Sequence, residues 1–135
     1  MVLASTALPA FMWLGTTSGL ARYDGRHVQT FPARPEQPGT LSHPFIHALL
    51  DDGQGTLWVG TNDGVDRLAL ATEQVRRVAL PPGLALQQRR ALGLAPRTAS
   101  QLWVGLAAGL HLLDRQSEQF TRWEPPAELA LADER

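Results

Sequence analysis

Two groups of polar residues have spacings that could bind a metal ion. His43 and His47 stand four residues apart, the spacing at which two histidines on a helix bind zinc. Pro44 lies between them in a strand-like context, which argues against a helix and therefore against a zinc site. The run DDGQG at 51–55 resembles the start of a calcium loop, but it lacks the further acidic positions and the closing glutamate. We therefore interpret that run as a tight turn and expect no metal site.

Two arginines and one further histidine are the other candidates for chemistry. Arg22 and Arg67 recur at one repeat position, and paired guanidinium groups could hold an anionic ligand. We favour a structural role, in which they link strands or blades by hydrogen bonds. His111, on a return strand, is expected to be a packed or edge histidine. The sequence has no cysteine and no G-x-S-x-G motif, so it predicts no catalytic residues, no cofactor and no enzyme activity.

The elements that must position these residues follow from an internal repeat. The motif LWVG stands at 57–60 and again at 102–105, and the variant MWLG stands at 12–15, so successive motifs begin 45 residues apart. We expect the repeated tryptophans to fill the space between units, where an indole N–H can reach a backbone carbonyl. We expect the glycines to allow sharp turns and close approach of neighbouring units. The repeat positions are Trp13, Trp58 and Trp103, then Gly15, Gly60 and Gly105, then Gly19, Gly64 and Gly109.

Each repeat predicts four short antiparallel strands. In the middle copy these strands are expected at 46–50, 57–61, 65–70 and 74–80. The runs at 51–55 and 61–64 carry the Asp-Gly chemistry of hairpin turns. Four antiparallel strands in 40–50 residues are typical of a β-propeller blade. The fold class is therefore all-β, with three four-stranded antiparallel blades at 1–45, 46–90 and 91–135.

Three blades leave two terminal faces uncovered, whereas propellers typically close with four to eight blades. The chain is therefore either part of a larger propeller or a propeller closed by self-association, in which two copies would supply six blades. Expected partners are thus the remaining blades or a second copy of the chain.

The composition restricts the class of protein further. The 135 residues carry a formal net charge of −1 and 44% hydrophobic residues, which suits a globular protein and disfavours nucleic-acid binding. The first charged residue is Arg22, but no basic segment precedes the apolar stretch before it, as a signal peptide would require. Because that stretch also holds several polar residues, glycines and a proline, we expect neither a signal peptide nor a membrane contact.

The repeats resemble the two-component regulator propeller family. The stretch MWLGTTSGLARYDG at 12–25 nearly matches that family's motif, and LWVGTNDGVDRLA at 57–69 and LWVGLAAGLHLLD at 102–114 match it in part. The linker GTLSHPFI at 39–46 is also similar to the family's inter-repeat segment. The resemblance implies a propeller in the periplasmic part of a membrane-anchored bacterial sensor, either a hybrid histidine kinase or a diguanylate cyclase. Several relatives in that family respond to carbohydrates.

If a ligand binds, propeller geometry places its site on the loops at one end of the blades, which are 32–45, 81–90 and the turns between second and third strands. The expected ligand is a small molecule or carbohydrate. Residues expected to contact it are Arg34, His43, Asn62, Asp63, Arg89 and Arg90. The leading hypothesis is a ligand-sensing module without catalysis. The alternatives are an interaction or self-assembling scaffold and, third, a propeller lyase or hydrolase.

Overall fold

The computed structural model of the chain describes residues 3–7 and 11–125. Within them the strands form three four-stranded antiparallel sheets. The N-terminal sheet holds β1 (Leu3–Ala7), β2 (Phe11–Thr16), β3 (Gly19–Tyr23) and β4 (Val28–Phe31). The middle sheet holds β5 (Ile46–Asp51), β6 (Thr56–Thr61), β7 (Gly64–Ala69) and β8 (Val75–Arg77). The C-terminal sheet holds β9 (Ala91–Pro96), β10 (Gln101–Leu106), β11 (Gly109–Asp114) and β12 (Phe120–Arg122).

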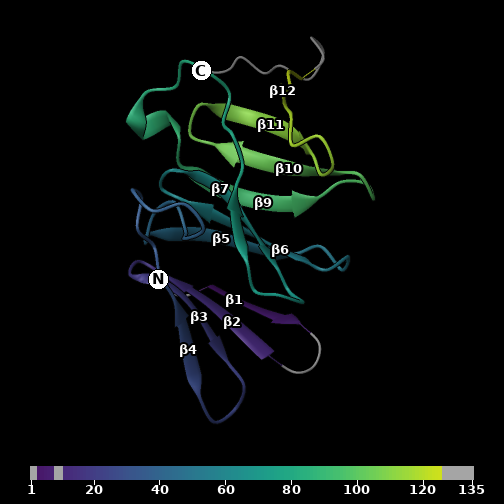
Figure 1. Cartoon of the computed structure of the whole chain (residues 1–135). Coiled ribbons are helices and arrows are strands. Elements are labelled where there is room, and N and C mark those ends of the chain that lie inside the picture. The colour runs from purple at the N-terminus through teal and green to yellow at the C-terminus, as the bar shows by residue number, and fades with distance from the viewer. Residues whose placement is uncertain (1–2, 8–10, 126–135) are drawn as a thin grey trace.

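The three sheets follow one another in chain order, from the purple N-terminal sheet to the green C-terminal sheet (Figure 1). Each sheet is a meander in which every strand pairs with the next along the chain. The first strands of the sheets are neighbours, because β5 contacts both β1 and β9. The sheets therefore meet face to face, in a propeller-like arrangement with the first strands on the inside.

The strands lie close to their expected positions, with one clear difference. The last strand of the middle sheet was expected at 74–80, but β8 ends at Arg77. Val78 still donates a backbone hydrogen bond to Val65, at 3.0 Å, before the chain turns away toward two prolines that have no N–H to donate. The first turn of the N-terminal sheet lies partly outside the described residues, at 8–10.

Two apolar clusters fill the spaces between adjacent sheets. Between the N-terminal and middle sheets, Trp13 packs with Phe31, their ring centroids 5.4 Å apart, and with Leu57 and Leu68. Between the middle and C-terminal sheets, Trp58 takes the same place. The remaining buried members are Leu20, Leu41, Ile46 and Val59 in the first cluster, and Val65, Val78, Ala91, Leu102, Val104, Leu106 and Leu113 in the second.

The repeated glycines of β2 and β6 set how closely the sheets approach. A Cβ atom on Gly15 would lie 2.6 Å from Ile46 Cγ2, and one on Gly60 would lie 2.6 Å from the carbonyl oxygen of Ala91. Both distances are shorter than any real Cβ contact, so only glycine fits at this spacing. Gly105 occupies the same repeat position in β10, but its nearest neighbour would be 3.8 Å away.

The buried indole groups of Trp13 and Trp58 do not donate to backbone carbonyls. Trp58 Nε1 donates instead to the Asp52 carboxylate, at 2.9 Å. The Trp13 indole nitrogen is buried with no hydrogen-bond partner. The reason lies in the repeat, because Ala7 occupies in the N-terminal copy the position that Asp52 occupies in the middle copy.

An arginine and a glutamate also link each pair of adjacent sheets. Arg22 of β3 pairs with Glu73, and Arg67 of β7 pairs with Glu118 at 2.6 Å. The two glutamates share one repeat position, and both have positive φ, 62° and 58°. Non-glycine residues rarely adopt that conformation, so both turns are held in place by their surroundings. Arg22 and Arg67 thus join the sheets.

Replacing Gly60 by alanine should destabilise the fold, because the new methyl group would overlap the Ala91 carbonyl. We expect a loss of about 1–3 kcal/mol in the free energy of unfolding, as for other overpacked interiors. Gly105→Ala is the matched control, since its repeat position is the same and its surroundings are open. Urea denaturation of dilute protein measures both variants, and equal losses would contradict this explanation of the glycines.

Candidate binding pocket

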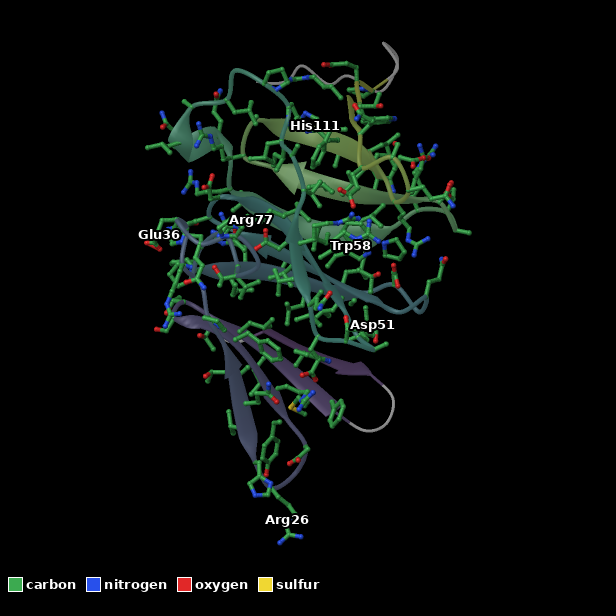
Figure 2. All side chains as sticks on the ribbon, in the orientation of Figure 1. Arg26, Glu36, Asp51, Trp58, Arg77 and His111 are labelled. Atoms are coloured by element: carbon green, nitrogen blue, oxygen red, sulfur yellow. The ribbon has the colours of Figure 1, made fainter. Side chains whose placement is uncertain are left out.

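A pocket of about 410 Å³ opens where three loops meet at one end of the middle sheet. The loop before β5 contributes His43, and the β6–β7 turn contributes Asn62 and Asp63. The loop before β9, which includes the short 3-10 helix η1 (Leu86–Gln88), contributes Leu86, Gln87 and Arg90. Figure 2 shows Glu36 and Arg77 on the left side of the molecule, and Asp51 on the right side.

Arg77 fixes the loop that carries His43. Its guanidinium group lies beside the chain at 34–41 and donates to the carbonyl oxygens of Arg34, Pro35, Gln37 and Thr40, at 2.7–3.1 Å. Five N–H donors in one planar group suit a loop whose carbonyls converge. The loop before β5 is therefore bound to the outer strand of the middle sheet.

Asp66, in the middle of β7, also fixes this loop. Its carboxylate is fully buried and accepts two hydrogen bonds from Ser42, from the backbone N–H at 2.7 Å and from the hydroxyl at 2.6 Å. Burial raises the pKa of Asp66 to about 6, although the bonds from Ser42 and the nearby Arg77 charge act in the opposite direction. Because Ser42 precedes His43, the buried carboxylate positions the histidine at the pocket.

A second set of contacts orders His43 and Asn62, two of the residues that line the pocket. His43 Nδ1 accepts the N–H of Phe45 at 3.1 Å, which leaves Nε2 of a neutral imidazole as a donor. The Phe45 ring stacks on His47, with centroids 4.6 Å apart, and His47 Nε2 is hydrogen-bonded to the Asn62 side-chain oxygen. With its oxygen engaged, the Asn62 amide group has its N–H donors available to a ligand.

Two charged residues, Asp63 and Arg90, line the pocket, and Arg89 lies beside it. Asp63 carries the carboxylate, and Arg89 faces it with a nitrogen–oxygen distance of 3.7 Å, which is a loose ion pair between half-exposed side chains. Arg90 donates through Nε to the Gln87 carbonyl at 3.1 Å. Leu86, 72% exposed, adds an apolar surface. The pocket therefore combines directional donors, one carboxylate and one apolar side chain.

The structure brings together four of the six residues that the sequence proposed as contacts, namely His43, Asn62, Asp63 and Arg90. Arg89 lines an adjoining pocket of about 430 Å³, which it shares with Asp63. Arg34 is exposed and lines neither pocket.

Sequence reasoning missed several residues of the site. Leu86 and Gln87 line the pocket, and Asp66, Ser42 and Arg77 hold its loop. An aspartate within an apolar strand was the one available signal, since a charge at a buried strand position requires a partner.

Within residues 3–7 and 11–125, no three His, Cys, Asp or Glu side chains are close enough together to hold a metal ion. In the same residues, no helix has the length and apolar character needed to span a membrane.

Residues 40–63 match the family model of the two component regulator propeller. That segment runs from the end of the Arg77-bound loop through β5 and β6 to Asp63, so it contains three of the pocket residues. The match confirms the resemblance that the repeat motifs had indicated. No curated protein matches the chain in sequence.

Several solved structures share the fold. The extracellular domain of the hybrid two component system BT3049 from B. thetaiotaomicron aligns with a TM-score of 0.74 and 20% identity, over 90% of this chain and 18% of that one. The extracellular domain of BT4673 from the same organism aligns with a TM-score of 0.73 and 17% identity, over 95% of this chain and 17% of that one. PorZ, a surface component of the type-IX secretion system of Porphyromonas gingivalis, aligns with a TM-score of 0.63 and 17% identity. That alignment covers 89% of this chain and 20% of that one. The chain thus spans about a fifth of these proteins and shares their propeller fold.

The buried carboxylate of Asp66 should make the stability of the protein depend on pH. Its folded pKa of about 6 lies above the ordinary value of 3.8, so the folded state binds the proton more tightly than the unfolded state. The Asp66 contribution to the free energy of unfolding should therefore increase as pH falls from 7.5 toward 4, by up to about 3 kcal/mol at about 1.4 kcal/mol per unit of pKa shift.

Asp66→Asn tests this assignment, since an amide oxygen can still accept from Ser42 but carries no charge. The difference in free energy of unfolding between wild type and variant, measured in urea between pH 4 and 7.5, isolates the Asp66 contribution. We expect the variant to be more stable than wild type at pH 7.5, with the difference shrinking below pH 6. If the free energy of unfolding changed with pH in the same way in both proteins, the assignment of the pH dependence to Asp66 would be contradicted.

Proposed function

We propose that this chain, which carries a two component regulator propeller repeat, is the ligand-sensing part of an extracytoplasmic receptor domain. Its three sheets are propeller blades at 1–45, 46–90 and 91–135. The domain binds a small polar molecule or carbohydrate and has no catalysis of its own. It belongs to the periplasmic region of a membrane-anchored bacterial two-component or diguanylate cyclase receptor.

The single observation that supports the binding role is that three separate loops converge on one pocket, where their side chains offer hydrogen-bonding groups to a ligand. His43, Asn62 and Arg90 offer donors from three loops, and the Asp63 carboxylate offers acceptors. Loops on a rigid scaffold are the usual place for binding residues. An exposed leucine beside such groups suits a ligand with both polar edges and an apolar face, such as a sugar ring.

The receptor role is supported by what the relatives in fold are. Two of them are extracellular domains of systems from B. thetaiotaomicron, one described as a hybrid two component system and the other as a one component system. In such a receptor, closing the loops around a ligand would alter contacts between blades, and the rigid sheets would transmit that change.

Turn exchange tests the pocket directly. Asn62→Thr with Asp63→Ser rebuilds the middle turn as the Thr17-Ser18 turn of the N-terminal sheet, so the fold is kept while two pocket groups are lost. Nuclear magnetic resonance titration with a panel of mono- and oligosaccharides should shift the amides of His43, Asn62 and Arg90. The exchanged protein should bind at least about tenfold more weakly, as expected when two hydrogen-bonding groups are removed.

Thr17→Asn with Ser18→Asp is the matched control, because it places the same two side chains in a turn that does not line the pocket. This variant should bind like wild type. Equal affinity of the wild type and the Asn62→Thr/Asp63→Ser variant, or shifts confined to other loops, would contradict the pocket. Finding neither a membrane helix nor an output domain in the flanking coding sequence would contradict the receptor role.

A further inference from the structure

The pocket at the end of the middle sheet has an excess of positive charge. Arg90 and Asp63 line it, and Arg89 lies beside it in the adjoining pocket. Behind them the buried Asp66 lies near the charge of Arg77. These five residues supply three guanidinium groups against two carboxylates, so one positive charge has no counterpart among them. The pocket therefore suits a ligand with a single negative charge.

Arg90 carries the unmatched charge. Asp63 has Arg89 as a loose partner at 3.7 Å, whereas Arg90 forms no salt bridge with any residue in 3–7 or 11–125. Its Nε donates to the Gln87 carbonyl at 3.1 Å, which fixes the guanidinium group at the pocket. The two terminal nitrogens remain to bind a ligand. That edge of a guanidinium group binds a carboxylate through two parallel hydrogen bonds.

The uncharged groups around Arg90 suit a ligand that also has hydroxyl groups. His43 and Asn62 offer N–H donors, since the other polar atom of each is already bonded within the protein. The Asp63 carboxylate accepts hydrogen bonds only. A hydroxyl group both donates and accepts, so neighbouring hydroxyls on a sugar ring can bind Asn62 and Asp63 together. The exposed Leu86 provides an apolar contact for a face of the ring.

Asp63 limits how much negative charge the ligand can bring. Its carboxylate lines both pockets, so a ligand bound to Arg90 lies close to it. A phosphate ester carries nearly two negative charges at neutral pH and would be repelled by Asp63. A carboxylate carries one charge, and its two oxygens lie in a plane that matches the two donors of the guanidinium edge. The charges and the donor geometry thus favour a carboxylate over a phosphate.

We propose that the ligand of this pocket is a sugar acid, a hexuronate whose carboxylate binds Arg90 and whose ring hydroxyls bind Asn62 and Asp63. This inference rests on the proposed ligand-sensing function and specifies its ligand. The groups that it uses come from the middle sheet and from the loop that joins this sheet to the C-terminal sheet (Figure 1). It therefore does not depend on what lies against the outer faces of the other two sheets.

A comparison of each sugar acid with its neutral parent tests the charge preference. Nuclear magnetic resonance titrations at neutral pH and low salt would use D-glucuronate with D-glucose, and D-galacturonate with D-galactose. At least one uronate should bind at least about fivefold more tightly than its parent sugar, because it adds a charge-assisted hydrogen bond. Added sodium chloride should reduce this preference, since a half-exposed ion pair is screened by salt, and should leave the affinity for the neutral sugar unchanged.

Substitutions of Arg90 test which residue reads the carboxylate. Arg90→Gln should remove the preference, so that the uronate and its parent bind equally, while the affinity for the parent sugar shows that the variant is folded. Arg90→Lys keeps the charge without the planar edge and should keep only part of the preference. Arg26→Gln is the matched control, because it removes the same charge from the exposed hairpin at the far end of the N-terminal sheet (Figure 2). It should keep the full preference.

The outcomes separate this inference from the proposed function. Equal binding of the uronates and their parents by the wild type, or a preference that survives Arg90→Gln, would overturn the sugar acid and leave the pocket as a site for neutral sugars. Tighter binding of the 6-phosphate or 6-sulfate of the same sugar would overturn the choice of a carboxylate. If no sugar, charged or neutral, shifted the amides of the pocket, the proposed function would be contradicted together with this inference.

Discussion

The close approach of adjacent sheets is the constraint on which the rest of this structure depends. Gly15 and Gly60 leave no room for a Cβ atom, so the first strand of the following sheet lies directly against them. At that separation a tryptophan fills the remaining space, and an arginine reaches the glutamate of the next sheet. The repeated motif thus sets the spacing between sheets, the side chain that packs between them and the ion pair that links them.

The pocket depends on the same spacing. Its residues come from the loops before β5 and β9 and from the β6–β7 turn, and these segments meet only because β5 and β9 lie side by side. Arg77 and Asp66 then fix the loop before β5 to the middle sheet. The binding groups are therefore carried by loops, while their relative positions are fixed by buried contacts that do not touch a ligand.

The repeat predicted the sheets well because glycine and tryptophan have strict steric requirements that recur at equal intervals. The strands around Trp58 lie where the motif placed them, and His43, Asn62 and Asp63 share one pocket because propeller loops emerge at one end. Leu86 and the Ser42–Asp66 contact were beyond prediction, since each depends on how a loop without repeat pattern folds back. The unpaired Trp13 indole shows the reverse case, in which a repeat position was kept and its partner was not.

The central claim is that glycine-limited contact between sheets exists in the folded protein. A nuclear Overhauser spectrum of the dissolved chain measures it most directly, through the proton distances at Gly15 and Gly60. The structure predicts cross-peaks from the Gly15 α-protons to an Ile46 methyl group and from the Gly60 α-protons to the Ala91 methyl group. Absence of both cross-peaks in a spectrum that shows the strand pairing within each sheet would contradict the account.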